Sequence, residues 1–392
     1  MRCLSLSLLV LLTACKVFDP SLVEELEDME AGAPDVPELP DVPAAVDVFD
    51  AGGPPIENGC DGEGMVFPQR PDGVDTSGDE RVIGLHELTL RQDGGRWRTI
   101  GRNLDGLCSL PPVPLVECQP REEESAPQID GEGGIDNAFG GAFFDLVNAT
   151  APELDQTARE ASTQGTGALV LRVRGYNGEA NDPRVEVAVL QSVYGFAGTA
   201  DETEPSEHTV VELGAYELDG MTRKPFPTWD GNDWLFPREE NFYDGDPETP
   251  VVLANDAYVT NGVLVVALED NVPFNFASAA IGISVKLTDA RLVVGIGEGT
   301  EMSGRAQLSG RWKIQEMLQS ARTLGICPGT PQYDILARRI DTLADVLSRP
   351  SDDNGVPCDA MSAGVEWNIA PARLGSLAMG VLPPDLCEEE EE

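Results

Sequence analysis

The sequence predicts a mainly β protein, an antiparallel β-sandwich of jelly-roll or concanavalin-like layout with a helical hairpin on its C-terminal side. Three observations predict this fold class. Short segments with period-two alternation or continuous apolar runs recur along the chain between turn residues. The pair Asn261-Gly262 separates two of these segments and is a hairpin signal, which favours antiparallel pairing over parallel crossovers. The clearest helical periodicity lies in two adjacent segments, residues 311–323 and 331–348.

The expected strands share one pattern. Each is alternating or continuously apolar and is bounded by glycine, proline, asparagine or aspartate, the residues that turns require. They span residues 82–90, 97–102, 167–176, 185–194, 210–218, 251–260, 262–268, 280–288, 290–296 and 302–312.

Helices are expected as insertions and near the C-terminus. The first insertion covers residues 136–147, where Asp136 is a suitable cap but Gly140 and Gly141 weaken the helix. The second covers residues 153–162. In the C-terminal hairpin Thr330 is the expected cap of the second helix, Pro331 occupies its first turn, and one apolar stripe contains Leu336, Ile340, Leu343 and Leu347.

The first residues of the chain have the pattern of an export signal. Arg2 precedes an apolar run at residues 4–12, which is too short to span a bilayer. The run ends in Leu12-Thr13-Ala14-Cys15, which resembles the bacterial lipoprotein signal. The resemblance implies that residues 1–14 are removed and that Cys15 is acylated, and Lys16 after it favours the outer membrane. The alternative is an ordinary signal with an incidental cysteine.

The mature chain is expected to contain a stalk, one domain and a tail. Residues 15–57 carry the lipidated cysteine and then an acidic, proline-rich segment with too little apolar surface to fold. Residues 58–387 form the β-sandwich domain with its helical insertions. Residues 388–392 are an acidic tail.

The charge of the chain limits its partners. The formal net charge is −43, with 69 acidic against 26 basic residues. Nucleic acid is therefore excluded as a partner, because phosphate binding depends on Lys and Arg. The expected partners are the membrane, reached through the lipid anchor, and a glycan or protein ligand.

Six cysteines remain after Cys3 and Cys15 are set aside. In an oxidising envelope an even number predicts three disulfides, although sequence alone does not choose the connectivity. The expected pairs are Cys108 with Cys118, Cys327 with Cys358, and Cys60 with Cys387.

No catalytic residue can be assigned from the sequence. His86 and His208 are the only histidines, and neither a G-x-S-x-G nor an H-E-x-x-H motif occurs. Carboxylates are so abundant that a pair suited to glycan hydrolysis is not excluded by residue type, but sequence spacing does not fix the distance between them. The chain is therefore not expected to be an enzyme.

One segment combines possible ligand-binding residues. Asp230, Asn232 and Asp233 are hard oxygen donors in a tight turn, the kind of ligand that Ca²⁺ requires, or they are simply turn residues. Trp229 and Trp234 flank this turn and would form a stacking platform for a glycan, or else pack as a small satellite core.

The mature region resembles uncharacterised envelope lipoproteins of high-GC Gram-negative bacteria, through segments such as residues 134–137, 176–183 and 326–331. That resemblance implies a lipid-anchored protein of the cell envelope and supplies no catalytic residues. The expected function is a non-catalytic binding or structural module, and the alternative is a carboxylate-based glycan hydrolase on the same β-sandwich.

Overall fold

The computed structural model describes most of the chain after the predicted stalk. It describes residues 67–73, 78–110, 114–121, 126–145, 147, 153–200, 208–212, 215–218, 222–224, 226–270, 273–277, 282–297, 304–351, 355–379 and 386–387. The chain divides into two units, Met1–Asp47 and Val48–Glu392, and every described residue belongs to the second. The predicted signal, Cys15, the stalk, Cys60 and the acidic tail lie outside the described residues.

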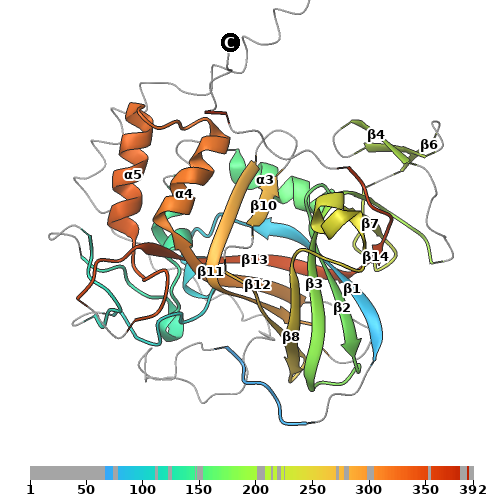
Figure 1. Ribbon diagram of the computed structural model, residues 1–392, viewed down its shortest axis with the longest axis horizontal. Helices are drawn as coiled ribbons and strands as arrows, with labels where there is room; N and C mark the ends of the chain where they lie inside the picture. The colour runs from blue at the N-terminus through green and yellow to red at the C-terminus, as the bar shows by residue number, and fades with distance from the viewer. Residues whose placement is uncertain are drawn as a thin grey trace, which may run out of the picture. The chain divides into compact units, whose positions relative to one another are not determined.

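Within the described residues, eight antiparallel strands form a closed β-barrel (Figure 1). The strands are β1 (Asp79–Thr89), β2 (Leu169–Tyr176), β3 (Asp182–Phe196), β8 (Leu253–Thr260), β9 (Val263–Ala267), β11 (Gly282–Gly295), β12 (Gly304–Lys313) and β13 (Ala360–Pro371). Each pairs with the next in chain order, and β13 pairs with β1. The ring closes through the pairing of β3 with β8, on which Val185 faces Ala257.

The prediction of a mainly β chain is therefore confirmed, but the predicted sandwich is wrong. A sandwich needs two separate sheets packed face to face, whereas here one sheet closes on itself. The strands were identified from local patterns, and those patterns do not show which strands pair across a long insertion. Strands β3 and β8, whose pairing closes the ring, are separated in the sequence by a long insertion, so no local pattern indicates that they pair.

Bulges allow the sheet to curve into a ring. The sequence predicts two strands at residues 280–288 and 290–296, but β11 runs through both. Asp289 lies at the join with a φ of 47°, and the pairing of β11 with β12 shifts register between Thr288 and Arg291. Such a bulge bends and twists a strand while keeping it in the sheet.

Aliphatic side chains fill the barrel interior. On β2 the buried residues Leu169, Leu171 and Val173 alternate along the strand, as one face of a sheet requires. Strand β13, which the sequence analysis missed, contributes Met361, Ala363, Val365, Trp367 and Ile369 to the same core. The predicted hairpin between β8 and β9 is confirmed, and its turn residues Asn261 and Gly262 both have positive φ.

Additional strands lie outside the ring. They are β4 (His208–Glu212), β5 (Ala215–Leu218), β6 (Thr222–Lys224), β7 (Trp234–Pro237), β10 (Pro273–Ala277) and β14 (Arg373–Leu374). Strand β7 pairs with the end of β3, and Leu235 packs against the outward-facing Val170 and Leu190. The insertion after β3 and the segment after β13 thereby cover part of the outer wall of the barrel.

The helices lie near one end of the barrel. They are the π-helix η5 (Phe139–Phe143), α3 (Leu154–Thr163), α4 (Ile314–Ala321) with the 3-10 turn η8 (Arg322–Leu324), and α5 (Pro331–Leu343). The predicted C-terminal hairpin is confirmed as α4 and α5, except that residues 311–313 belong to β12. The second helix also ends at Leu343 rather than at residue 348, so Leu347 lies beyond it. Thr330 caps α5 as predicted, with its side chain accepting a hydrogen bond from the Tyr333 amide at 3.3 Å. None of the described helices has the length and apolar character needed to cross a membrane.

Two predicted strands are wrong. The strand expected at residues 210–218 is instead the antiparallel pair of β4 and β5. Residues 97–102 lie in a loop that begins with the 3-10 turn η3 (Arg96–Arg98). Further 3-10 turns occur at η4 (Glu132–Gly134), η6 (Glu239–Asn241) and η7 (Tyr243–Gly245). The apolar residues that suggested a strand instead anchor the loop, and Ile100 is buried.

The predicted disulfide pairing is also wrong. Cys118 is bonded to Cys358, and Cys327 is bonded to Cys387. Cys108, which is itself disulfide-bonded, therefore does not pair with Cys118. The fold rather than the sequence spacing decides the pairs, because the loop carrying Cys118 packs beside the start of β13 and its Gln119 bridges to Pro357.

Candidate functional site

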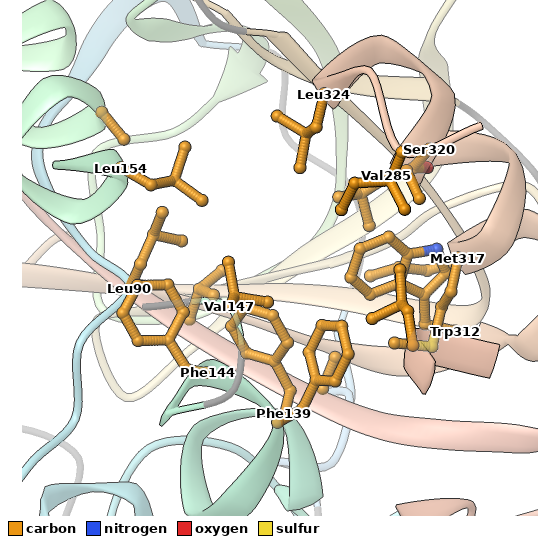
Figure 2. Close-up of a pocket in the computed structure, with 18 of the residues that line it drawn as sticks. Leu90, Phe139, Phe144, Val147, Leu154, Val285, Trp312, Met317, Ser320 and Leu324 are labelled. Atoms are coloured by element: carbon orange, nitrogen blue, oxygen red, sulfur yellow. The ribbon is translucent and has the colours of Figure 1, made fainter. Parts of the chain in front are cut away.

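An apolar cavity lies where one end of the barrel meets the helices (Figure 2). Its floor consists of inward-facing side chains from three adjacent strands, namely Leu287, Leu308, Ala363 and Val365. These side chains are also part of the main hydrophobic core. The floor is therefore rigid, since each strand is held by backbone hydrogen bonds to its neighbours.

Aromatic rings form one wall of the cavity. Phe139, Phe143 and Phe144 come from η5 and the residue after it, and Trp312 comes from the end of β12. The ring of Trp312 lies 6.1 Å from that of Phe139 and 6.4 Å from that of Phe143, the second in an edge-on arrangement. These separations lie in the range that aromatic pairs favour, so the rings hold one another in place.

Helical side chains form the remaining walls. Leu154 and Ala158 come from α3, Met317 and Ala321 from α4, and Leu336 from α5. Figure 2 shows Leu154, Leu90 and Val147 across the cavity from Met317 and Trp312. The volume of the cavity is about 70 Å³. It is smaller than the roughly 300–1,000 Å³ that ligand sites in proteins commonly enclose, so it suits only a small molecule.

Polar groups in the lining are few. Apart from Trp312, Ser320 is the only described lining residue with a polar side chain, and none carries a charge. The Ser320 hydroxyl is within hydrogen-bond distance of the backbone oxygens of Ser284 and Glu316. The Trp312 Nε1 donor is buried and has no acceptor among the described residues. The accessible surface of the cavity is therefore almost entirely apolar.

A second, smaller hollow lies on the outer side of β12 and β13 and contains carboxyl groups. Asp105, Asp130 and Asp136 come from the loop after η3, and Asp345 follows α5. Burial raises the pKa of Asp345 to about 7, although hydrogen bonds from Ser362 oppose this. Burial also raises the pKa of Asp130 to about 6 and the pKa of Asp136 well above its usual value, and the neighbouring carboxylates add to both effects.

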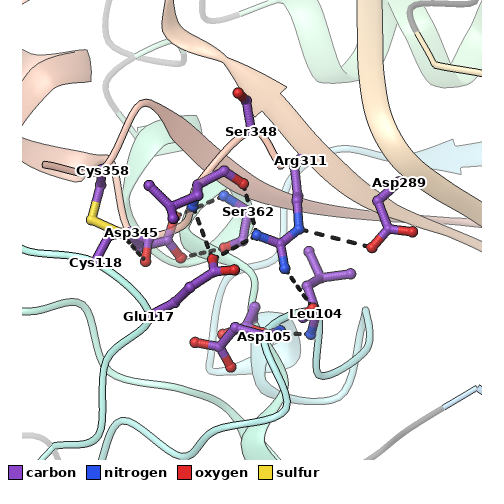
Figure 3. Close-up of polar contacts among 12 residues, drawn as sticks. Leu104, Asp105, Glu117, Cys118, Asp289, Arg311, Asp345, Ser348, Cys358 and Ser362 are labelled. Carbon is purple, nitrogen blue, oxygen red and sulfur yellow. Dashed lines mark hydrogen bonds and ion pairs between the residues drawn. A yellow bond between two sulfur atoms is a disulfide. The ribbon is translucent and has the colours of Figure 1, made fainter. Parts of the chain in front are cut away.

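A buried ion pair lies beside these acids (Figure 3). Arg311 Nη1 lies 2.6 Å from Glu117 Oε2, and the arginine side chain is completely buried. The same guanidinium donates to the carbonyls of Leu347 at 2.7 Å and Leu104 at 2.6 Å. Arg311 thus links β12 to the segments that contain Leu104 and Glu117 and to the segment after α5. The next residue, Trp312, lies on the cavity side of β12.

Hydrogen bonds connect the acidic hollow to the cavity wall. The Ser362 hydroxyl on β13 donates to Asp345, and the Ala138 amide donates to that hydroxyl at 2.8 Å. Ala138 caps η5, which carries Phe139 and Phe143. Asn137 adds a second link, because its Oδ1 accepts from the amide of Gly364 at 3.0 Å.

The tryptophans predicted as a glycan platform lie elsewhere, on the outer wall of the barrel. Trp229 stacks on His86 with ring centres 4.3 Å apart, and its Nε1 donates to the Thr163 carbonyl at 2.9 Å. Burial lowers the pKa of His86. Trp234 packs in a small cluster with Tyr194, and the Arg373 guanidinium lies 5.5 Å from the Trp234 ring. The cavity does not include either tryptophan, and the glycan platform stays a prediction.

The predicted calcium ligands form a hydrogen-bonded turn. Asp230 Oδ1 accepts from the Asn232 amide at 2.9 Å, and Asp233 Oδ1 accepts from the Thr228 amide at 3.0 Å. Asn232 Oδ1 accepts from Arg373 at 3.2 Å. No group of three or more histidine, cysteine or acidic side chains among the described residues is arranged to hold a metal ion. Calcium binding at Asp230, Asn232 and Asp233 stays a prediction.

Sequence reasoning missed the cavity because its walls come from segments far apart in the chain. Trp312 was recognised as part of a strand, and Phe139 and Phe143 as one helical face, but nothing local shows that they meet. No family model matches the chain, and searches of curated proteins and of solved structures return no significant match.

Proposed function

We propose that this chain is a lipid-anchored protein of the cell envelope that binds a small apolar molecule in the cavity at the end of its barrel, without catalysing a reaction. The observation that carries this proposal is the lining itself, which is apolar except for Ser320 and the indole nitrogen of Trp312. Apolar surface around an open space stabilises a bound hydrocarbon by removing it from water.

The architecture supports the same proposal. Eight-stranded barrels are either filled by side chains or just wide enough to hold one small ligand. In this barrel side chains such as Trp367 and Ile369 fill the interior, while the helices hold the end near Trp312 open. The described lining of the cavity contains no carboxyl group, and a carboxylate-based glycan hydrolase needs two at its site. We therefore favour binding over hydrolysis.

A cavity-filling substitution tests the proposal. The uncharged fluorescent probe N-phenylnaphthylamine should bind the wild-type protein and become brighter as it leaves water. Ala158→Trp places a large ring in the cavity and should weaken binding by about tenfold or more, which corresponds to at least 1.4 kcal/mol. The matched control is Ala267→Trp, because Ala267 is exposed on β9 away from the cavity. It should bind the probe as the wild type does.

Two outcomes would contradict the proposal. One is a wild-type protein that does not bind the probe at any concentration below the solubility limit of the probe. The other is an Ala158→Trp variant that folds, as judged by circular dichroism, and binds with unchanged affinity.

A further inference from the structure

We propose that a flap on the outer wall of the barrel is a pH-sensitive switch, which closes over Asp345 at acidic pH and opens as the pH rises through neutral. The flap consists of residues 102–109 and 130–136, two described segments that pair with each other at Arg102 and Asp136. The switch is separate from the apolar cavity and needs no ligand there.

Hydrogen bonds join the two segments of the flap. The Asp136 amide donates to the Arg102 carbonyl at 3.1 Å, and Asp136 Oδ2 accepts from the Leu104 amide at 2.6 Å. At the other end of the flap, Asp130 Oδ2 accepts from the Ser109 amide at 2.6 Å. Two short paired segments are not stable on their own, so these amides become open to exchange with solvent when the flap leaves the barrel.

Asp345 lies in the hollow under the flap and is fixed to the barrel. Its Oδ1 accepts from the Ser362 amide at 2.7 Å, and its Oδ2 accepts from the Ser362 hydroxyl (Figure 3). Ser362 belongs to β13 and is completely buried. Asp345 therefore stays with the barrel when the flap moves.

Acidic side chains of the flap share this hollow with Asp345. They are Asp105, Asp130 and Asp136. Burial first, and then the charges of Asp130 and Asp105, raise the pKa of Asp345 to about 7 against the opposing effect of the Ser362 hydrogen bonds. Burial and the charges of the other three acids raise the pKa of Asp136 well above its usual value. Ionisation therefore puts like charges on both sides of the contact between flap and barrel.

Glu117 and Arg311 also act on the hollow. Burial raises the pKa of Asp105, and Glu117 adds to this effect while Arg311 opposes it. The charges of Glu117 and Arg311 largely cancel, because the two are paired at 2.6 Å. Arg311 also donates to the Leu104 carbonyl at 2.6 Å, and Ile135 of the flap is completely buried. These contacts hold the flap closed while the acids are protonated.

The direction of the pH effect follows from Asp345. In the open state water reaches its carboxyl group, whose pKa returns towards 3.8, so the closed state binds the proton more tightly. This stabilisation of the closed flap is fully present below about pH 4 and is lost as the pH rises through about 7. One proton changes the ratio of open to closed flap by up to about tenfold per pH unit.

Asn137 limits the movement to the flap. Its side chain donates to the Ile100 carbonyl and to Gln92, both at 2.8 Å, and accepts from the Gly364 amide at 3.0 Å. The residue is buried, with 2% of its surface exposed. Asn137 therefore stays on the barrel when the flap opens, and η5, which follows it, keeps its place.

Hydrogen–deuterium exchange of the full chain, followed by mass spectrometry, tests the proposal. Each exchange rate is divided by the rate of an unstructured peptide at the same pH. Between pH 5 and pH 8 the protection of the amides of Leu104, Ser109 and Asp136 should fall by at least about tenfold. Because the flap opens without the barrel, its protection at pH 8 should be at least about tenfold below that of β2 and of η5.

A matched pair of substitutions identifies the titrating group. Asp345→Asn keeps an acceptor for Ser362 and cannot ionise, so the protection of the flap should change by less than about twofold over the same pH range. Asp244→Asn is the control, because Asp244 is exposed and its φ of 53° suits asparagine. It should keep the wild-type pH profile.

Three outcomes would overturn the proposal. They are flap protection in the wild type that does not change with pH, equal protection of the flap and β2 at pH 8, and an Asp345→Asn variant with the wild-type pH profile. If Asp345→Asn does not fold, Asp130→Asn removes a charge from the flap side and is judged by the same criterion. None of these results depends on binding in the cavity, so the proposed function stands or fails separately.

Discussion

Arg311 and Glu117 form an ion pair on the outer wall of the barrel, with 2.6 Å between Nη1 and Oε2 and almost no exposure of either side chain. Glu117 Oε2 also accepts from the Leu347 amide at 2.9 Å, so the pair joins three segments that are distant in sequence (Figure 3). Such a pair contributes little compared with apolar packing, but breaking it leaves a charge buried without its partner.

Glu117→Ala is therefore expected to destabilise the fold by about 3–5 kcal/mol. The double substitution Arg311→Met with Glu117→Leu should recover most of that loss, because neither charge remains. Unfolding in guanidinium chloride measures both variants. As a control, Asp93→Ala removes a half-exposed partner of Arg91 and should change stability by less than about 1 kcal/mol. Equal effects of Glu117→Ala and Asp93→Ala would contradict the structure.

The acidic hollow predicts that stability falls as pH rises through the neutral range. Asp345 has a pKa raised to about 7, against 3.8 for the free group, because burial favours its protonated form. Protons therefore bind the folded chain more tightly than the unfolded chain. The stabilisation is complete below the unfolded pKa and is lost as pH rises through the folded value, at up to about 1.4 kcal/mol per pH unit for one proton.

Asp345→Asn tests this pH dependence, since asparagine does not titrate. The unfolding free energy of the wild type should fall between about pH 5 and pH 8 at constant ionic strength, and the variant should show a smaller slope. The comparison of slopes removes the contribution of the many exposed acids. Parallel pH profiles for the two proteins would show that Asp345 does not titrate in this window.

The two disulfides that join described residues are expected to differ in their effect on stability. Cys118–Cys358 closes a separation of 240 residues, and Cys327–Cys387 closes a separation of 60 residues. In the chain-entropy model the longer loop stabilises by about 1 kcal/mol more. Cys118 and Cys358 are also buried in the core. Replacing that pair by alanine should lower the unfolding midpoint in denaturant more than replacing Cys327 and Cys387, and the reverse order would argue against this account.

Lipidation of Cys15 remains a prediction about a segment outside the described residues. Its basis is the sequence Leu12-Thr13-Ala14-Cys15 after a short apolar run. Cys15→Ser should release the protein from the membrane fraction, because stable attachment requires the acyl chains. Mass spectrometry of the wild-type N-terminal peptide supplies the direct measurement. A peptide of unmodified mass, together with unchanged fractionation of the variant, would contradict this prediction.

Local sequence patterns predicted most strands but not their assembly. Alternation identified β2 and β3 because each strand turns one face to the core, and Asn261-Gly262 identified the β8–β9 hairpin because type I′ turns need positive φ. Closure depends on contacts such as Val185 with Ala257, across an insertion that no local pattern spans. The same limit explains the wrong disulfide pairs, since the cysteines meet through tertiary packing.

The candidate cavity was less predictable than the fold. Strand β13 does alternate, with Ala363, Val365 and Trp367 separated by Gly364 and Glu366, so a careful count of period two could have found it. The cavity also needs the ends of β11 and β12, η5 and the three helices to converge at one place. A single sequence carries no signal of that convergence.

The pairing of β1 with β13 joins the first strand of the ring to the last. Ile83 faces Pro371 across this ladder, so two positions almost three hundred residues apart become neighbours. A chain that emerges from the ribosome with its N-terminus first therefore cannot close the barrel until β13 has followed. Until then β1 presents an unpaired edge, and such edges recruit other strands and promote aggregation. The edge of β1 is therefore expected to be most prone to aggregation before β13 has been synthesised.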